Sequence, residues 1–481
     1  MSTKIALFGA GKLGSRIAEL LLKRRVKIDC FIDEDPDKND QMLKGIKIHL
    51  PEHLLTLGND VKIIISIKDI DPILSKLEDM GFIKGKNVFS HDEASVSVKF
   101  IDYKPTRDSK MNEINSEKNN IHQVLLISPL QLASDVSEND SEEPISAKMP
   151  KVGNNTGNMV FVEAMRKQLD LDFDACYAKG EHYRGFQFGN VHAVMPSANF
   201  IYHGFTSWHE SVLTFLNNTN FPITFAGLGA QADSITDDPQ SVMDKLAPIS
   251  KEFLFAVAKR CVSLGVRGKF TAECLEAVGI HNYRVIGCPS MYMTFKDGRS
   301  TLPNPHDAKT VMHITPYNLS VYETKILELG YSIKSEWIMQ TYDECDLKGL
   351  LINPKFPDLS VDKKDILDYH KEHSHVFFSY GKWDKFLKES NFTFSFGSRF
   401  HGNVMAINAG IPALWITHDS RTQEFMDVFS LPHIKMEEMA NIFNINQLIE
   451  RCDYSKFYKK YPEMLKEYKK YLDENNLSNM F

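Results

Sequence analysis

The sequence predicts an α/β protein built from three domains, each organised around a mainly parallel sheet. Short apolar runs alternate with amphipathic stretches of helical length along most of the chain, as expected for strand–helix–strand units. Several apolar runs end in glycine or small polar residues, as parallel strands do where a ligand-binding turn begins. A glycine-rich turn follows the first run. We place the three domains at residues 1–105, 106–300 and 301–481.

The bulk properties fit a large globular protein and exclude several functional classes. The 481 residues suffice for two or three domains, and 43% hydrophobic with 25% charged residues are ordinary values. The formal net charge of −7 argues against a nucleic-acid partner held by an overall basic surface. The seven cysteines form no Cys-x-x-Cys pair, and no His-x-x-x-His pair on a predicted helix is backed by a nearby acid, so we expect no metal site.

The start of the chain favours a cytoplasmic location. The first residues lead directly into an apolar strand, without the pattern of a signal peptide. No apolar run approaches the length of a membrane span. We therefore expect a cytoplasmic protein, and any contact with a membrane would be peripheral, on its inner face.

The first domain has the sequence pattern of a small Rossmann unit. Residues 4–8 predict a strand, residues 9–14 have the spacing Gly-x-Gly-x-x-Gly, and an amphipathic helix extends to about residue 23. A second strand, at residues 26–32, ends at Asp33. Gly9, Gly11, Gly14 and Asp33 would line a site for a nucleotide or nucleotide-sugar. Glycines also serve turn geometry alone, and the unit is short for the full six-stranded fold, so both alternatives stay open.

The segments that follow predict linkers and a loop at a helix start. Residues 104–120 have linker composition, and residues 134–143 form an acidic, serine-rich stretch typical of a solvated loop. The sequence Gly-Asn-Asn-Thr-Gly-Asn (153–158) then precedes a helix at about residues 159–169. Asn155 in this loop would present its amide to a ligand or serve the turn and helix cap.

Two strand–helix series make up the rest of the chain. In the first, predicted strands at residues 192–195 and 224–227 end in polar residues that include Asn199 and Gln231. A hinge is predicted at residues 297–308, which carry two prolines, and the second series begins at residue 310. The last ~40 residues predict helices rich in Tyr and Lys, which would more commonly dock on the domain body than on a membrane.

Residues 395–402 (Ser-Phe-Gly-Ser-Arg-Phe-His-Gly) are the stretch most typical of a functional site. A buried strand, a Gly/Ser turn and a short helix up to about residue 409 would leave backbone N–H groups unpaired at the helix start. Arg399 and His401 add a fixed cation and a proton donor at that point. This arrangement predicts an anion site at the carboxyl edge of a parallel sheet. The alternative is that both residues cap the helix or pair with surface carboxylates.

Ordered motifs along about residues 153–433 resemble those of the polysaccharide pyruvyltransferase family. The sequence Ser-Arg-Phe-His-Gly (398–402) is followed by Ala-Gly-Ile-Pro (409–412) and Asp-Ser-Arg-Thr-Gln-Glu (419–424). Upstream stand Gly-Leu-Gly-Ala-Gln (227–231), Gly-Val-Arg (265–267) and Gly-Cys-Pro-Ser (287–290). The first ~110 residues lie outside this resemblance and are similar to N-terminal modules of sugar-modifying proteins in surface-polysaccharide pathways.

The resemblance implies a fold and a reaction. The fold is GT-B-like, with two doubly wound α/β domains and a cleft between them. The reaction moves a pyruvyl group from phosphoenolpyruvate onto two hydroxyls of one sugar, giving a cyclic ketal in cell-surface polysaccharide such as capsule or exopolysaccharide. The partners would be phosphoenolpyruvate and a lipid-linked or nucleotide-linked sugar acceptor, and no cofactor would be required.

The resemblance also assigns roles to residues. Arg267 and Arg399 would bind the donor from opposite walls of the cleft, with Phe400 beside them, and His401 would be the general acid. The general base would be Asp419 or Glu424. Further predicted substrate-binding residues are Asn155, Asn199, Gln231 and Arg421.

Two assignments have alternatives within the sequence. Arg421 would act as a third cation or pair with Glu424 three residues on. Cys288 is a conceivable nucleophile, but buried thiols are mostly inert.

Two other functions fit the same sequence. A GT-B glycosyltransferase would bind a nucleotide-sugar with a similar helix start in its second domain. A non-catalytic nucleotide-sugar-binding protein would keep the fold and lose the chemistry, although Arg267, Arg399 and His401 together favour an enzyme. The acceptor sugar, its linkage and the oligomeric state are not specified by any motif.

Overall fold

The computed structural model describes residues 4–23, 27–58, 61–67, 70–83, 87–90, 123–128, 143–169, 173–176, 191–217, 222–232, 238–294, 301–479 and 481. The chain forms two compact units, one carrying strands β1 to β6 and the other carrying everything from β7 onward. The predicted linker at 104–120, residues 134–142 of the acidic stretch and residues 297–300 of the hinge lie outside the described residues. The domain boundaries at 105 and 300 also fall there and stay predictions.

The first unit is a Rossmann-like sheet in the order β3-β4-β2-β1-β5-β6. Its pairs are parallel except β3 with β4, which form a hairpin. The sheet therefore has six strands, more than we expected from so short a unit, because the hairpin supplies one of them. The elements are β1 (Ile5–Phe8), α1 (Lys12–Lys23), β2 (Cys30–Ile32), β3 (Met42–Leu43), β4 (Ile46–His49), β5 (Lys62–Ile65), α2 (Asp71–Asp79) and β6 (Val88–Ser90).

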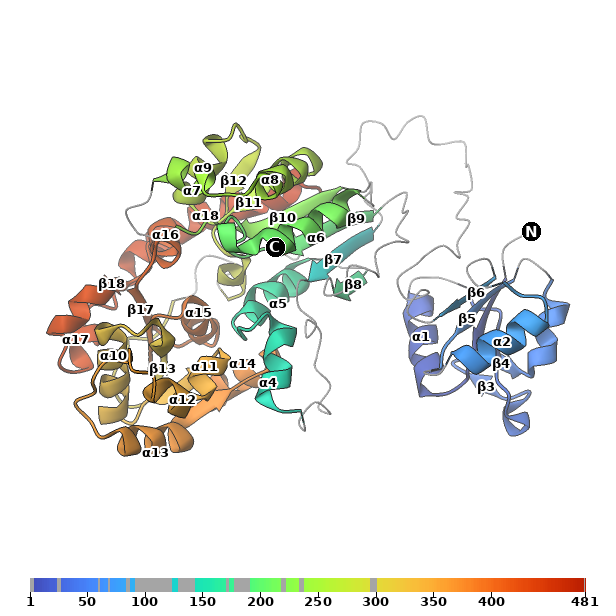
Figure 1. Ribbon diagram of the computed structural model, residues 1–481, viewed down its shortest axis with the longest axis horizontal. Coiled ribbons are helices and arrows are strands. Elements are labelled where there is room, and N and C mark those ends of the chain that lie inside the picture. The colour runs from blue at the N-terminus through green and yellow to red at the C-terminus, as the bar shows by residue number, and fades with distance from the viewer. Residues whose placement is uncertain are drawn as a thin grey trace. The chain divides into compact units, whose positions relative to one another are not determined.

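The second unit contains two further six-stranded sheets, both wholly parallel where their pairing is described (Figure 1). The second sheet has the order β12-β11-β10-β9-β7-β8. Its elements are β7 (Gln123–Ser128), α4 (Ile145–Lys148), α5 (Asn158–Gln168), β8 (Phe173–Cys176), β9 (Val191–Pro196), α6 (Thr206–Asn217), β10 (Ile223–Leu228), α7 (Pro239–Asp244), α8 (Pro248–Arg260), β11 (Leu264–Val266), α9 (Lys269–Glu276) and β12 (Tyr283–Val285).

The third sheet has the order β15-β14-β13-β16-β17-β18, the arrangement of a doubly wound Rossmann sheet. The strand order reverses between β13 and β16, which places a ligand-binding crevice at their carboxyl ends. Its elements are β13 (Thr310–His313), α10 (Val321–Ser332), β14 (Glu336–Met339), α11 (Tyr342–Cys345), α12 (Leu347–Leu351), α13 (Lys363–His373), β15 (Ser374–Val376), α14 (Tyr380–Glu389), β16 (Phe394–Gly397), α15 (Phe400–Asn408), β17 (Ala413–Thr417), α16 (Ser420–Phe429), β18 (His433–Lys435), α17 (Asn446–Ile449) and α18 (Ser455–Glu474).

The predicted α/β fold class is confirmed, and one hydrophobic core joins the second and third sheets. Buried side chains from β7, β10, β13, β16 and β17 belong to a single contiguous cluster. Burial of this apolar surface is the dominant stabilising term, and it makes the two sheets one unit.

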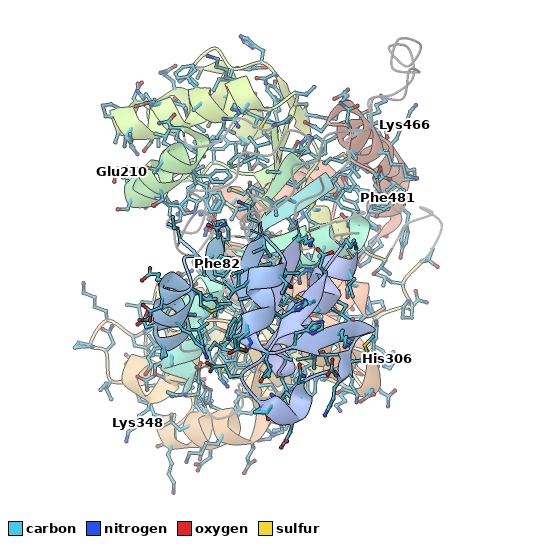
Figure 2. The ribbon with its side chains drawn as sticks, turned by 90° about the vertical axis from the view of Figure 1, so that its right-hand side faces the viewer. Phe82, Glu210, His306, Lys348, Lys466 and Phe481 are labelled. Carbon is cyan, nitrogen blue, oxygen red and sulfur yellow. The ribbon has the colours of Figure 1, made fainter. Side chains whose placement is uncertain are left out.

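The C-terminal helix α18 docks on the protein body. Its tyrosines face inward: Tyr468 donates to the Gln168 side chain of α5 at 2.6 Å, and Tyr471 donates to the Phe225 carbonyl of β10 at 2.8 Å. Lys466 lies on the exposed face of the helix (Figure 2). The helix that ends the third-sheet series therefore packs along the second sheet and ties the two together. No helix among the described residues is long and apolar enough to span a membrane.

Candidate functional site

The turn after β16 is shaped by glycine and by a buried asparagine. Gly397 has φ +141°, and a Cβ there would lie 1.9 Å from the His313 carbonyl oxygen. Asn403 holds the turn from the next helix, because its Nδ2 donates to the Gly397 carbonyl at 3.0 Å. Arg399 is the N-cap of α15, and its side chain accepts no capping hydrogen bond. Among the described residues no acceptor pairs with the first N–H groups of α15, so these groups are left for a ligand.

Arg399 is held rigidly and is buried, with 7% of its surface exposed. One guanidinium nitrogen, Nη2, pairs with the fully buried Glu344 and donates to Thr341 Oγ1 at 3.1 Å. Nε donates to the Ile314 carbonyl at 3.2 Å, and the Tyr317 ring lies 5.0 Å from the guanidinium carbon. Within the part of the chain that the structure describes, Nη1 makes no hydrogen bond, so this is the nitrogen that Arg399 offers to a ligand.

Arg267 follows β11 in the second sheet and has no carboxylate partner among the described residues. It is 5% exposed, its Nε donates to the Gly227 carbonyl at 3.0 Å, and its guanidinium lies over the Phe425 ring at 4.9 Å. Gly229 makes room for it, since a Cβ there would lie 2.5 Å from the arginine side chain. Burial lowers the pKa of Arg267 to about 10, which leaves it charged at neutral pH. A buried cation without a counter-ion favours an anionic ligand.

His401 lies on the first turn of α15, close to Arg267 and Cys288. Its Nε2 is 3.5 Å from Cys288 Sγ, and its ring contacts Phe161 of α5 at 5.6 Å between centroids. Burial and the charge of Arg267 lower the pKa of His401 to about 3. The imidazole is therefore neutral near pH 7 before a donor binds. The predicted acid must acquire its proton during the reaction. Burial also raises the pKa of the Cys288 thiol, which does not favour a nucleophilic role.

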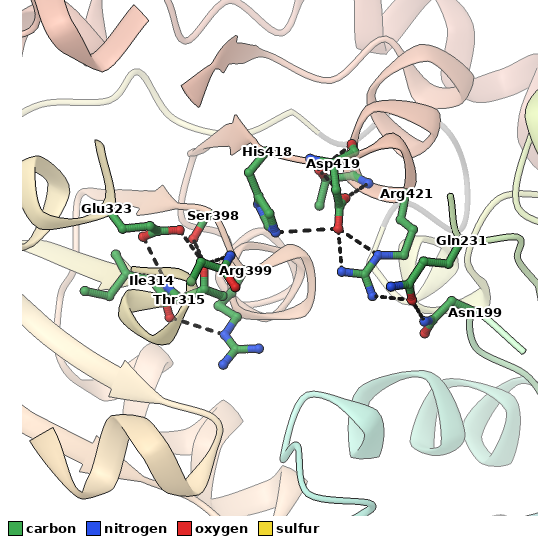
Figure 3. A network of polar contacts seen from close by, with 12 residues as sticks. Asn199, Gln231, Ile314, Thr315, Glu323, Ser398, Arg399, His418, Asp419 and Arg421 are labelled. Atoms are coloured by element: carbon green, nitrogen blue, oxygen red, sulfur yellow. Dashed lines mark hydrogen bonds and ion pairs between the residues drawn. The ribbon is translucent and has the colours of Figure 1, made fainter. Parts of the chain in front are cut away.

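A polar chain joins the predicted residues Asp419, Arg421, Gln231 and Asn199 (Figure 3). Arg421 donates from Nε to Asp419 Oδ2 at 2.7 Å and from Nη1 to Gln231 Oε1 at 3.3 Å. Asn199 donates to the same oxygen of Gln231. The structure thus brings together residues from the ends of β9, β10 and β17. The alternative pairing of Arg421 with Glu424 is wrong, because Asp419 takes its place.

Asp419 is poorly suited to the predicted role of base. It is the N-cap of α16, where Oδ1 accepts from the Thr422 amide at 2.8 Å. Burial by itself would raise the pKa of Asp419, but the adjacent Arg421 and His418 hold it well below the ordinary value. A carboxylate so strongly stabilised in its charged form is a weak proton acceptor.

Glu424 is the N-terminal cap of a helix in the other half of the unit. Its two oxygens accept from the Thr271 amide at 2.7 Å and from Thr271 Oγ1 at 2.9 Å, at the start of α9. Gly268 allows this approach, since a Cβ there would lie 2.3 Å from the glutamate side chain. Burial raises the pKa of Glu424 to about 7. Both oxygens are occupied, so the structure does not support Glu424 as the base either.

The remaining predicted residues of the second unit differ in their placement. Asn155 accepts from the Gly157 amide at 2.9 Å, which is turn chemistry, while the Thr156 amide donates to the Gln340 carbonyl at 2.9 Å. The loop therefore lies against the third-sheet half, beside His401. Phe400 is 8% exposed and stacks on Phe425 at 3.8 Å, so its side chain belongs to the core and supports the ring beneath Arg267.

In the N-terminal turn, the backbone conformation and packing require glycine at positions 9 and 14 but not at position 11. Gly9 has φ +109°, and a Cβ on Gly14 would lie 1.9 Å from the Gly9 carbonyl oxygen, so both are needed for the turn. Gly11 has an ordinary φ, and a Cβ there would meet nothing within 4 Å. Asp33 accepts from the Ala10 amide at 2.7 Å and pairs with Lys38 at 3.1 Å, so its carboxylate is already engaged.

Three site residues escaped the sequence prediction. Glu344 and Tyr317 fix Arg399, and His418 lies 3.5 Å from Asp419 Oδ2. Glu344 lies in a short helix with no motif around it. Tyr317 follows β13, the strand beside β16, so its position after a predicted strand was the one available signal. Among the described residues, no group of three or more His, Cys, Asp or Glu side chains is placed to hold a metal ion.

Comparison with known families gives two matches. Residues 239–420 match the family model described as polysaccharide pyruvyl transferase, and residues 1–88 match the model described as C2185-like, N-terminal. The first match includes Arg267, Arg399 and His401. No curated protein sequence matches the chain.

Several solved structures are similar to the chain at low identity. UDP-D-quinovosamine 4-dehydrogenase from Vibrio fischeri is 24% identical over 19% of this chain and 78% of its own, with a TM-score of 0.16. MnaA from S. aureus with UDP is 9% identical over 76% and 92%, with a TM-score of 0.32. A variant of Os79 from O. sativa with UDP is 11% identical over 72% and 95%, with a TM-score of 0.30. These values carry no information on the reaction.

The raised pKa of Glu424 predicts a pH-dependent loss of stability that Glu424→Gln removes. The native carboxyl keeps its proton to about pH 7, whereas an unfolded one loses it near pH 4.5, so native stability falls as pH rises between these values. The glutamine mimics the protonated cap. As the pH rises from 5 to 8, we expect the unfolding free energy of wild type to fall by up to about 3 kcal/mol relative to that of Glu424→Gln. Urea denaturation at both pH values measures this.

The control for this experiment is Glu389→Gln, which changes an exposed residue at the end of α14. Its difference from wild type should not change with pH. A pH-independent difference for Glu424→Gln as well would show that the Glu424 carboxyl titrates normally.

Proposed function

We propose that this protein transfers a pyruvyl group from phosphoenolpyruvate to two hydroxyls of a sugar, forming a cyclic ketal in cell-surface polysaccharide biosynthesis. The observation that carries the proposal is Arg267, a buried cation without a carboxylate partner among the described residues, close to His401 and the uncapped start of α15. The match of residues 239–420 to polysaccharide pyruvyl transferases supports it.

The donor carries a phosphate and a carboxylate, and the site offers separate cations for them. Two of the helices that start at this site are closed to a ligand, because Glu424 caps α9 and Asp419 caps α16. The start of α15 is open, and Arg399 Nη1 is free of other hydrogen bonds among the described residues. We therefore assign the phosphate to the start of α15 with Arg399, and the carboxylate to Arg267.

The proton balance of the reaction suits a histidine that starts neutral. One sugar oxygen bonds to C2 of the donor while C3 gains a proton and becomes a methyl group. The second sugar oxygen then displaces phosphate from C2. Of the two hydroxyl protons, one ends on C3 and the other leaves with phosphate. A neutral His401 can accept the first proton from the hydroxyl and deliver it to C3, acting as base and then as acid. This removes the need for Asp419 or Glu424 as base.

Donor binding would also change the pKa of this histidine, because Arg267 lies close to it. Arg267 lowers the pKa of His401 in the ligand-free protein. A bound phosphate and carboxylate would offset that positive charge and favour the imidazolium that forms during proton transfer. Arg421, held by Asp419 and turned toward Gln231, would position the acceptor side of the site. The acceptor itself would be a lipid-linked or nucleotide-linked saccharide, which suits a cytoplasmic protein with peripheral membrane contact.

The reaction is tested by incubating the protein with phosphoenolpyruvate and simple glycosides such as methyl β-D-galactopyranoside and methyl α-D-mannopyranoside. We expect release of inorganic phosphate and a product that carries a pyruvate ketal by mass spectrometry. The competing GT-B glycosyltransferase would instead use a nucleotide-sugar and release a nucleoside diphosphate. The second competitor, a nucleotide-sugar-binding protein without activity, would release neither.

Variants separate donor binding from proton transfer. Arg267→Lys keeps the charge but loses the planar fork, and it breaks no ion pair with a described residue, so we expect kcat/KM for phosphoenolpyruvate to fall roughly 10- to 100-fold. His401→Gln keeps a hydrogen-bond donor but cannot relay a proton, so kcat should fall by ~10²–10⁴ with a smaller change in KM. Steady-state kinetics decide this, and a His401→Gln enzyme with near wild-type kcat would remove the histidine from the chemistry.

The N-terminal unit is a separate proposal, in which the turn at Gly11 binds a nucleotide or nucleotide-sugar. Gly11 leaves open space above the backbone at the start of α1, which is what close approach of a diphosphate requires. Calorimetric titration of the full-length protein with NAD and a panel of UDP-sugars should find a ligand. Gly11→Val should abolish that binding without unfolding the protein, because a Cβ at this position meets no atom within 4 Å. Unchanged binding in Gly11→Val, or no binder in the panel, would make the unit structural.

A further inference from the structure

Aromatic residues are concentrated in the segment after β9, next to the polar chain described above. Phe200, Tyr202, Phe205 and Trp208 fall within nine residues, and we call these four side chains the aromatic loop. They lie between β9 and the first turn of α6, at the carboxyl edge of the second sheet. Phe200 is buried, and the other three are partly exposed. The predicted functional site does not use any of them.

The base of the aromatic loop is rigid. Trp208 stacks on Phe200 with 3.9 Å between ring centroids, and its edge meets Phe253 of α8 at 5.3 Å. His209 fixes the loop from below, because its ring nitrogens contact the Phe200 carbonyl at 2.7 Å and Ser250 Oγ at 2.8 Å. One face of the Trp208 ring is therefore covered by protein, while part of the side chain stays open to solvent.

The outer part of the aromatic loop carries Tyr202 and Phe205, whose rings lie beside each other. Tyr202 packs over the backbone at Gly204, where a Cβ would lie 2.7 Å from the tyrosine ring. The Phe205 ring meets Tyr202 at 5.8 Å and Phe200 at 6.0 Å. Tyr202 and Phe205 thus extend the apolar surface that begins at Trp208. Residues 199–205 include no Asp, Glu, Lys or Arg, in contrast with the arginine-rich donor site.

Backbone and side-chain contacts connect the aromatic loop to the proposed site. Ile201 pairs with Ala230 as a parallel bridge, and the Gln231 amide donates to the Ile201 carbonyl at 3.0 Å. The Gln231 side chain then accepts from both Asn199 and Arg421. The aromatic loop and the two amide side chains are therefore joined through the backbone at Ile201, and the same two amides lead to Arg421.

We propose that the aromatic loop, with Asn199 and Gln231, binds a pyranose ring of the acceptor. A pyranose has an apolar C–H face that fits an aromatic ring and a rim of hydroxyls that fits amide groups. The ligand is uncharged at this end, which matches the absence of charged side chains in residues 199–205. The predicted effect on kcat/KM for the acceptor rests on the proposed function. Saccharide binding to the aromatic loop does not require catalysis and can be tested separately.

Tryptophan fluorescence tests the binding directly. The chain has four tryptophans, and Trp337, Trp383 and Trp415 are almost fully buried, so Trp208 is the one that an external ligand can reach. Titration with methyl β-D-galactopyranoside, methyl α-D-mannopyranoside and their disaccharides should give a saturable emission change and protection from iodide quenching. Trp208→Phe should be silent, which assigns the signal. No response to any saccharide would overturn the proposal.

Tyr202→Ala tests the same surface without disturbing the stacked base of the loop. The matched control is Tyr331→Ala, a partly exposed tyrosine on α10 of the third-sheet half. In Tyr202→Ala the saccharide affinity should fall roughly three- to tenfold, as should kcat/KM for the acceptor, with KM for phosphoenolpyruvate unchanged. The control should leave both values unchanged. An unaltered saccharide affinity in Tyr202→Ala, or an equal fall in the control, would contradict the proposal.

The two readouts distinguish this inference from the proposed reaction. A saturable Trp208 signal in a protein that releases no phosphate from phosphoenolpyruvate would keep the saccharide site and remove the pyruvyl transfer. Phosphate release with a silent Trp208 and an unaltered acceptor KM in Tyr202→Ala would keep the reaction and place the acceptor elsewhere.

Discussion

The cap that Glu424 places on α9 is the contact on which the functional site depends. The Glu424 carboxyl, from the third-sheet half, accepts from the amide and the hydroxyl of Thr271, in the first turn of a helix that begins just after Arg267. It therefore fixes the end of β11 against the α16 segment, whose Phe425 ring lies beneath the Arg267 guanidinium. Burial destabilises the ionised form of this carboxyl, and its pKa is raised as a result. This contact adds to the shared hydrophobic core and to the docking of α18 in holding Arg267 near the start of α15.

The placement of charged side chains distinguishes the start of α15, which has no side-chain cap, from the starts of α9 and α16, which are capped by carboxyl groups. Asp419 and Glu424 satisfy the starts of α16 and α9, and Glu344 neutralises Arg399 on one side only. Among the described residues Arg267 has no carboxylate partner, and its charge adds to burial in lowering the pKa of His401. An anion that binds here would form an ion pair with buried Arg267 and accept hydrogen bonds from the first amides of α15. The same anion changes the protonation of the neighbouring histidine, which couples donor binding to chemistry.

The sequence predicted the α/β class and the positions of the cations because both follow from local patterns. Arg267 and Arg399 follow the parallel strands β11 and β16, so both lie at the carboxyl ends of strands, and Arg399 also lies where the strand order of the third sheet reverses. The roles of Asp419 and Glu424 stay predictions, because both carboxylates also cap helices. Whether a carboxylate caps a helix or faces a ligand depends on tertiary contacts, and Thr271 lies far from Glu424 in the sequence. The pairing of Glu344 with Arg399 and the lowered pKa of His401 also depend on tertiary contacts, so the sequence did not predict them.

A crystal structure of the protein soaked with phosphoenolpyruvate is the most direct test of the account. The account predicts the phosphate at the start of α15, within about 3 Å of Arg399 Nη1 and of the first backbone amides, and the carboxylate on Arg267. It also predicts His401 beside the C3 carbon. Phosphoenolpyruvate bound away from Arg267 and α15, or a nucleotide-sugar bound there in its place, would contradict the account.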